Sequence, residues 1–563
     1  MNNIITMNDV YTLNQSYATT KRESVKWDVK KRSNFKVVDS QNGSYSGNYS
    51  SFDLSSISNS GLLLDWQSSE FVCPISIIVD RPQGTPFIED NKFLACLKSN
   101  YALVDSMSLT LSGFPVISQQ KMSSALIAYE MATNWTEDDY KRSSRFGMAF
   151  EDSTKFQVNT ANSCYGMEGV SATSVLDFDP SASTFAEHLT GLKNATPNLG
   201  RKARCEQTYY ADNADMNTLK DIGSVAKERR SYIKPFDANK PTQQVFNINA
   251  RMSLAHLHSY FKNAPLSSNG LYRLEFYLNL AKKTEIKMAG GKTAFANATD
   301  KATAKVYSSI STTTSNQYNP LSLGSLATSD AMGAMEAAEL DMSIVMKVGN
   351  DDETACFLNV ALIELSVGAA EKYIENPVRT WEYDSHLFQD LPAVKANGTV
   401  QVQLSASMSR VRKIILLPYY TNSEGTDAPS DLLSPFNGIG ASTLTGVGAS
   451  ITDLQCLISG VQLYQNQVTE VKDFYDMFRA HSLNGGVDTA SINSSPVNME
   501  QFMAGYGAIV LDCTKGQKES DFDLAKSYTL SFRNNTKKEC RYLTYLIYSS
   551  VITQNIETGT IVL

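Results

Sequence analysis

The residues with the clearest potential for metal chemistry are His256 and His258, two positions apart in a chain that contains five histidines. A shared metal ion would require both imidazoles on one side of the backbone. The surrounding stretch, LAHLHSYF, has the apolar spacing of a helix, with Leu254, Leu257 and Phe261 on one stripe. On a helix, residues two apart point about 200° from each other, so this pair cannot share a metal ion. We therefore expect His256 to face outward, His258 to pack or form a hydrogen bond, and the chain to hold no metal or cofactor.

Carboxylates offer a second possible chemistry. Asp65 or Glu70 could act with Glu275 as acid and base in a carbohydrate-active β-sandwich, which requires two carboxyl groups roughly 5–10 Å apart across one cleft. A further acidic group, Asp351-Asp352-Glu353, follows Gly349 and Asn350 between two strand-like segments. This pattern predicts the tip of a hairpin, with calcium binding as the alternative.

Other sequence patterns argue against a phosphate loop, a zinc site, a signal peptide and a membrane-spanning segment. AGGKT at 289–293 has Ile286 where a phosphate loop needs glycine, so it is typical of a turn. The eight cysteines form no CxxC pair and no zinc-type spacing, which favours buried thiols in a reducing compartment. We expect no signal peptide, because the first residues lack a basic patch followed by an apolar core. No apolar run approaches the length that spans a bilayer.

Charge is distributed unevenly along the chain. The formal net charge is −8, which argues against a general nucleic-acid binder. Residues 1–36 contain seven basic and three acidic residues, so this segment is +4 and the remainder is −12. A basic arm on an acidic body could contact a polyanion such as packaged DNA or lipid headgroups. The alternative is a solvated terminal arm with local ion pairs.

Period-2 alternation predicts that most of the chain is β structure. In TVQVQLSASMS, at 399–409, apolar residues occupy every second position, as in a half-buried strand. The other strands that we predict are 71–79, 107–111, 342–348, 357–366, 527–533 and 541–551. The last of these is apolar on both faces, which indicates a strand that is covered on both sides.

Helices are predicted to be few and short. We expect one at 253–261 with Ser253 as its cap, a similar one at 468–486 beginning near Thr469, and a third at 326–341. Long Ser/Thr/Asn/Gly-rich loops separate these elements at 151–225, 290–330 and 421–450. The pattern indicates an all-β protein with two β-sandwiches in tandem, joined near 371–385.

Several segments resemble one viral family in the order in which they occur. The helix at 253–261, Pro265-Leu266, a turn and the alternating strand YRLEFYLNL resemble a segment of the major capsid proteins of virophages and polinton-like viruses. Further similar segments are 65–79, 91–116, 409–438, 455–478 and 541–563. The chain departs from the family pattern at 510–517, where VLDCTKGQ replaces a DLSR-like segment.

This resemblance implies two tandem eight-stranded jelly-roll β-sandwiches with short helices and long inserted loops. It implies a basic arm at 1–36, a first jelly roll at 37–375 and a second at 376–563. The implied function is that of a non-catalytic major capsid protein in the virion, made in the host cytoplasm or a viral factory. Its copies would form pseudo-hexagonal trimers that tile an icosahedral shell around DNA.

The same resemblance implies the partners of the chain. These are other copies of itself, penton proteins, and minor or cement capsid proteins. The arm would point inward, where Lys26, Lys30 and Lys31 are the best candidates for contact with DNA or an internal membrane. The alternatives are the carbohydrate-active sandwich enzyme and a glycan-binding, receptor-binding or adhesion sandwich.

Overall fold

The computed structural model describes most of the two halves of the chain. The described residues are 29–40, 45, 48–58, 61–80, 93–97, 99–134, 243–268, 270–280, 284–287, 307–310, 320–325, 342–351, 353–420, 451–480, 508–514, 523–535 and 540–561. All structural statements concern these residues. The predicted helix at 326–341, the loops at 151–225 and 421–450, and AGGKT lie outside them.

Two antiparallel four-stranded sheets form the first sandwich. One has the order β1-β13-β3-β7, with bounds Val29–Val38, Phe357–Leu365, Leu63–Asp80 and Gln243–Ser253. The other has the order β2-β8-β5-β6, with bounds Tyr49–Asp53, Tyr272–Leu278, Val104–Leu111 and Phe114–Ile117. The sheets face each other through an apolar core, in which the Phe71 ring of β3 stacks on Phe276 of β8 at 4.1 Å between ring centroids.

The second sandwich repeats this plan. Its first sheet has the order β14-β21-β16-β19, with bounds Val378–Asp390, Cys540–Asn555, Val411–Tyr420 and Ile509–Asp512. Its second sheet has the order β15-β20-β17-β18, with bounds Thr399–Met408, Lys526–Asn534, Ile451–Ile458 and Val461–Gln462. The short strand β22, Thr560–Ile561, extends the first of these sheets by pairing with β21.

Strand order identifies the topology of both halves. If the eight strands of each sandwich are counted along the chain, one sheet has the order 1-8-3-6 and the other 2-7-4-5, in both sandwiches alike. This arrangement, with eight strands in two sheets, is the jelly roll. The predicted all-β fold, two tandem eight-stranded jelly rolls, is confirmed. The predicted strands at 71–79, 107–111, 342–348, 357–366, 399–409, 527–533 and 541–551 are all present.

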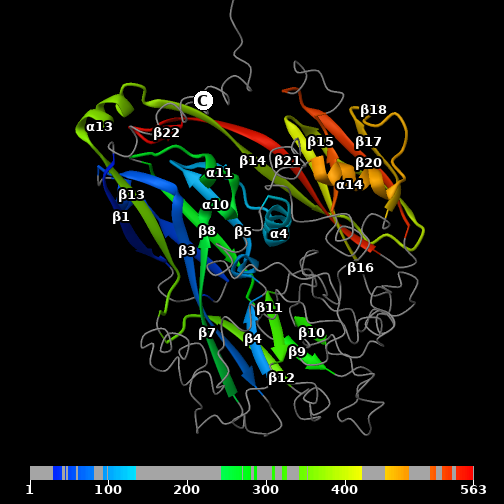
Figure 1. Ribbon diagram of the computed structural model, residues 1–563, viewed down its shortest axis with the longest axis horizontal. Coiled ribbons are helices and arrows are strands. Elements are labelled where there is room, and N and C mark those ends of the chain that lie inside the picture. The colour runs from blue at the N-terminus through cyan, green and yellow to red at the C-terminus, as the bar shows by residue number, and fades with distance from the viewer. Residues whose placement is uncertain are drawn as a thin grey trace, which may run out of the picture.

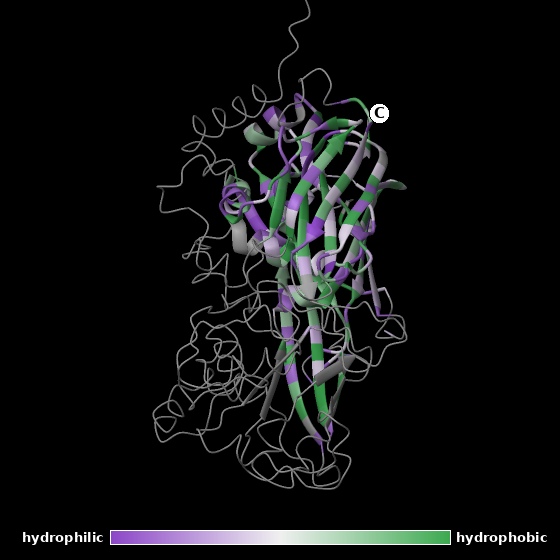
Figure 2. Cartoon of the chain, turned by 90° about the vertical axis from the view of Figure 1, so that its right-hand side faces the viewer, coloured by the Kyte–Doolittle hydropathy of each residue, from purple (hydrophilic) through white to green (hydrophobic). Residues whose placement is uncertain are grey.

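Further strands extend the first sandwich away from the second. β12, Met342–Val348, pairs with the distal half of β3, and β9 pairs with β12 and β10. β4 and β11 form a separate ribbon in the same lower region of Figure 1. In Figure 2 two long strands continue well past the body of the sandwich. The bounds are Thr284–Lys287 for β9, Tyr307–Ile310 for β10, Phe93–Leu97 for β4 and Leu321–Ser325 for β11.

The acidic segment near Asp351 is not a hairpin tip, contrary to the prediction. β12 pairs with Ile75–Asp80 and β13 with Leu63–Val72, and both run antiparallel to β3. β7 occupies the opposite edge of β3 along Glu70–Asp80. β12 and β13 therefore follow one another along the same edge in the same direction, and the described residues 349–351 and 353–356 between them interrupt a single line of pairing.

Short helices connect the strands. They are α3, Ser55–Ser58; η1, Asn100–Leu103; α4, Ser123–Asn134; α10, Leu254–Leu257; α11, Ser259–Asn263; α13, Val367–Ile374; and α14, Val471–Ala480. The predicted helix at 253–261 is two helices, because the backbone of His258 is extended (φ −157°, ψ 142°). Ser253 precedes α10, but its side chain forms no capping hydrogen bond. The helix predicted at 468–486 is present as α14, beginning at Val471.

The structural counterpart of α14 is α4, whereas the sequence had suggested the helix at 253–261. Each of these two helices follows the fifth strand of its sandwich and precedes the sixth. Of the predicted basic arm at 1–36, Val29–Lys36 belongs to strand β1 and pairs with β13, and residues 1–28 lie outside the described residues. Between the sandwiches, α13 ends at Ile374 and β14 begins at Val378, near the predicted boundary at 375.

Candidate functional site

Two tyrosines join the sandwiches from within the core. The Tyr383 hydroxyl of β14 donates a hydrogen bond to the Val116 carbonyl at 2.7 Å, and the Tyr545 hydroxyl of β21 donates to the Met122 carbonyl at 2.8 Å. Both tyrosines are buried. An unpaired buried hydroxyl or carbonyl costs about 1–3 kcal/mol, so sliding one sandwich over the other would be opposed at both points.

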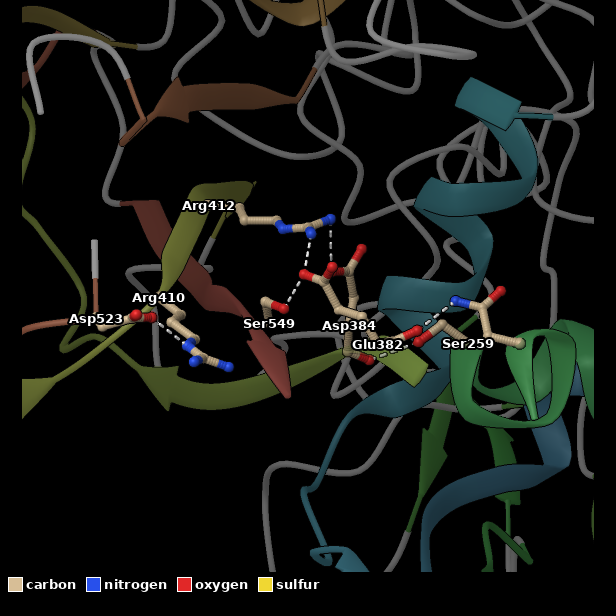
Figure 3. Close-up of polar contacts among 8 residues, drawn as sticks. Ser259, Glu382, Asp384, Arg410, Arg412, Asp523 and Ser549 are labelled. Carbon is tan, nitrogen blue, oxygen red and sulfur yellow. Dashed lines mark hydrogen bonds and ion pairs between the residues drawn. The ribbon is translucent and has the colours of Figure 1, made fainter. Parts of the chain in front are cut away.

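A second set of hydrogen bonds lies beside the helix pair α10–α11. The Ser259 hydroxyl donates to the Asp384 carbonyl at 2.6 Å, and the Asn263 amide donates to the Glu382 carbonyl at 2.9 Å. Figure 3 shows Ser259 of α11 beside Glu382 and Asp384 of β14. Strand β14 is thus held by the first sandwich along one side, while its backbone pairs with β21 of the second along the other.

Two acidic residues of β14 take part in an ionic cluster with side chains of β16 and β21. Arg412 contacts the carboxylates of both Glu382 and Asp384, and Ser549 also donates to Glu382 (Figure 3). The Arg412 side chain is 39% exposed, so water screens these contacts. We call this contact region between the two sandwiches the junction. The ionic cluster fixes side-chain geometry at the junction more than it adds to the stability of the fold.

Helix α4 crosses from the first half of the chain into the core of the second sandwich. Its buried residues Ala125, Leu126 and Tyr129 belong to that core. The Tyr129 ring lies edge-on to Phe478 of α14, with 6.3 Å between centroids. The two equivalent helices of the jelly rolls are therefore linked by this ring pair.

A small pocket lies between α4, the α10–α11 break, β14 and β21. Its titratable lining residues are Glu130, His258, Asp384 and His386. Burial lowers the pKa of His386 to about 4, and burial together with the neighbouring His386 lowers the pKa of His258 to about 3. Burial raises the pKa of Glu130 to about 6. Both histidines are therefore neutral at physiological pH.

The two histidines of the sequence motif have separate roles. His258 accepts a hydrogen bond from the Tyr260 backbone N–H at its Nδ1, at 3.1 Å, and so caps α11. His256 is half-buried and shares a hydrogen bond of 2.8 Å with the Tyr101 hydroxyl. The expectation that His258 packs or forms a hydrogen bond is confirmed. Within the described ranges no three His, Cys, Asp or Glu side chains are arranged to hold a metal ion.

The carboxylates proposed as acid and base are not brought together. Phe71 and Phe276 face each other inside the first sandwich, so the adjacent residues Glu70 and Glu275 point to opposite outer faces. Asp65 likewise points outward, because its neighbour Trp66 is buried in the core. Glu275 binds Arg273 at 2.8 Å and Glu70 binds Arg251 at 3.7 Å.

The acidic loop at 349–356 is held by local contacts. Asn350 N–H donates to the Glu353 carbonyl at 2.8 Å, and the Glu353 side chain forms an ion pair with Lys36 at 2.7 Å. Gly349 has a φ of +94°, and a side chain there would meet the Thr354 carbonyl oxygen. Asp352 lies outside the described residues.

The three lysines predicted to contact anions have different positions. Lys30 is on β1 and forms an ion pair with Glu364 at 2.5 Å, and Lys31 is exposed on the same strand. Lys26 lies outside the described residues. The structure therefore places two of the three on an edge strand of the first sandwich.

Several large apolar side chains are exposed on α13 and on segments near β14 and β8. Val367 is 77% exposed, Leu271 60%, Val378 48% and Phe114 45%. Backbone hydrogen bonds bring their segments together, from Ser268 to Ile556, from Ile556 to Pro377 and from Ser112 to Leu271. We call these four residues the apolar end.

Sequence reasoning missed the junction. Helix α4 was not predicted, although Ala125, Leu126 and Tyr129 in SSALIAYEMATN have helical spacing. Nothing in the sequence marks Tyr383 or Tyr545 as junction residues, because their acceptors are backbone carbonyls far away in the chain. No helix among the described residues is long and apolar enough to cross a membrane.

No protein family matches the chain, and no curated protein matches it. Among solved structures, the chain is similar to a protein in the cryo-EM structure of the Sputnik virophage, with 12% identity over 95% of this chain and 88% of that chain, at a TM-score of 0.49. It is also similar to the mavirus major capsid protein, with 9% identity over 94% and 89% and a TM-score of 0.43. The Faustovirus major capsid protein is similar at 10% identity over 93% and 90%, with a TM-score of 0.43.

Proposed function

We propose that this chain is a major capsid protein that acts by assembly and without catalysis. The observation that carries the proposal is the presence, in one chain, of two jelly rolls of identical strand order, held side by side by a buried junction. A sandwich that serves only as a binding module needs neither the duplication nor the fixed angle. A shell subunit needs both, because its neighbours must find the same surfaces in every copy.

Three such chains around a threefold axis would present six similar sandwiches. This trimer has the outline of a hexagon, so identical copies can tile a shell with hexagonal packing. Closed rotational symmetry is the common way in which identical subunits assemble. In this arrangement the junction sets the angle between successive corners of the hexagon.

The apolar end supports self-association. Exposed apolar patches larger than a few hundred Å² mark interaction sites in soluble proteins, and backbone hydrogen bonds connect the segments of Leu271 and Val378 within the apolar end. Val367 and Leu271 lie close to the chain segment that joins the sandwiches, where a neighbouring subunit could cover them. Penton and minor capsid proteins would bind at other edges of the same trimer.

The experiment that tests this function is a measurement of mass and shape in solution. The purified protein should have a mass near three times 62.0 kDa by light scattering. Negative-stain images should show pseudo-hexagonal particles. A stable monomer at micromolar concentration that binds glycans would instead favour an adhesion or carbohydrate-binding sandwich.

The basic N-terminal segment would face the inside of the shell, in a virion assembled in the host cytoplasm or a viral factory. Lys26, Lys30 and Lys31 would then contact DNA or lipid headgroups, with Lys30 shared between the anion and Glu364. Charge reversal of Lys31 to Glu should weaken salt-sensitive binding to DNA or to anionic vesicles. Unchanged binding across a salt series would remove Lys31 from the contact.

A further inference from the structure

Each jelly roll contains one pair of neighbouring buried cysteines. In the first sandwich, the Sγ atoms of Cys73 and Cys356 are 3.5 Å apart. In the second, Cys456 lies on β17 and Cys513 directly follows β19, and interaction with Cys456, together with burial, raises the pKa of the Cys513 thiol. All four residues are 0% exposed.

The backbone around the first pair suits a covalent link. Cys73 lies on β3 and Cys356 immediately precedes β13, one residue beyond the registered partners Val72 and Phe357. Residues that face each other on neighbouring antiparallel strands have Cα atoms about 4.5–5.5 Å apart, which is within the range that disulfides span. The Sγ atoms need to approach by about 1.5 Å to reach bonding distance.

The second pair connects different sheets. Cys456 is on β17, and Cys513 directly follows β19, in the facing sheet. The Cys513 N–H donates to the Arg412 carbonyl of β16 at 2.9 Å, which fixes the position of its backbone. A bond here would join the two sheets of the second sandwich, whereas the first pair would join neighbouring strands of one sheet.

We propose that Cys73–Cys356 and Cys456–Cys513 are sites of disulfide formation that lock the two jelly rolls when the protein leaves a reducing compartment. The oxidant is a small disulfide such as oxidised glutathione. One protein thiolate attacks a sulfur of the oxidant and releases one thiol, giving a mixed disulfide. The second cysteine then displaces the other thiol, so two electrons and two protons pass from each pair to the oxidant.

The environment of the thiols slows their exchange once the protein is folded. The hydrogen bond to Cys356, together with burial, raises the pKa of Cys73, and interaction with Cys456, together with burial, raises the pKa of Cys513. The thiolate is the reactive form, so exchange requires local opening of the strands. Formation of these disulfides does not depend on the proposed capsid function, so it can be tested on any folded sample of the protein.

The test brings the full-length protein to redox equilibrium from two directions. Native reduced protein is incubated with oxidised and reduced glutathione at a denaturant concentration below the unfolding transition, and unfolded protein is refolded into the same buffer. Agreement of the two end states shows that equilibrium has been reached. Peptide mapping without reduction should then find Cys73 linked to Cys356 and Cys456 linked to Cys513, and oxidised protein should have a higher Tm.

Variants assign the effect to each pair. Cys73→Ala and Cys513→Ala should each remove one link and its share of the rise in Tm. Cys540→Ala is the matched control, because buried Cys540 faces Tyr420, at the opposite end of β16 from Arg412. The proposal is overturned if folded wild-type protein retains these four thiols at equilibrium in the most oxidising buffer, carries glutathione on them, or pairs them differently.

Discussion

His258 is a single residue with two structural tasks. Its extended backbone separates α10 from α11, and its Nδ1 accepts the Tyr260 N–H that begins α11. The ring also lies near Tyr383 and His386 of β14, with centroid distances of 6.0 and 6.3 Å. A neutral imidazole is required for this acceptor role, so protonation removes a cap and places charge inside the junction.

This arrangement predicts a loss of stability in acid. His258 and His386 have folded pKa values of about 3 and 4, below the value of 6.5 expected in the unfolded chain. Below pH 6.5 these histidines therefore bind protons in the unfolded state but stay neutral in the folded state. The free energy of unfolding then falls by about 1.4 kcal/mol per pH unit for each histidine that differs in this way. Glu130, whose pKa is raised to about 6 from 4.5, opposes this trend between those two values.

The measurement is Tm as a function of pH from 7.5 to about 4.5, which covers the onset of the decline below pH 6.5, where protonation of these histidines begins to differ between the folded and unfolded states. His386→Gln should flatten the decline, since it removes one of the two protons. The control is His256→Gln, which changes a histidine outside the pocket. A decline of equal slope in wild type and His386→Gln would show that other groups control the acid response. The charges facing the pocket, Asp384 and the nearby Lys413 and Lys262, are unchanged in both variants.

At the scale of elements, local sequence patterns predicted where strands lie but not which strands pair with each other. The alternation in 399–409 and 541–551 is visible because each strand buries one or both faces over many residues. The break between α10 and α11 was not predictable, because the apolar spacing of Leu254, Leu257 and Phe261 continues across it. The loop at 349–356 looked like a hairpin because only the distant strand β3 determines how β12 and β13 pair.

Helix α4 provides a prediction at this scale. Tyr129→Ala should remove a buried ring between α4 and α14 and lower the free energy of unfolding by about 3–5 kcal/mol. Chemical denaturation followed by tryptophan fluorescence and circular dichroism measures the loss. Tyr475→Ala, on the partly exposed side of α14, is the matched control and should cost less. Equal losses would mean that the α4–α14 contact adds little to the junction.

For the whole molecule, the duplicated jelly roll was predictable and the junction was not. The strand pattern repeats along the sequence, whereas the hydrogen bonds of Tyr383 and Tyr545 join residues far apart in the chain. The lysines predicted to contact anions likewise form contacts with distant residues that the sequence alone could not predict. Their positive charge was evident, but the pairing of Lys30 with Glu364 depends on the register of β1 and β13.

The apolar end yields the prediction for assembly. Val367→Asp and Leu271→Asp should each weaken self-association by about tenfold or more, since each would place a charge in a covered apolar contact. Light scattering over a dilution series measures the change, and Tm of the dissociated chain should stay the same. Val461→Asp is the control, because Val461 is 70% exposed on β18, on the other side of the molecule in Figure 1. Dissociation by Val461→Asp alone would place the interface at β18 instead.

The loop at 349–356 separates two lengths of strand that are each aligned independently against β3. Its length can therefore change without shifting the register on either side, as it could not in a hairpin, where the turn sets the alignment of both arms. A foreign peptide inserted next to Asp351 should leave both strands in place. In an assembled shell, one such graft would be repeated once for every copy of the chain.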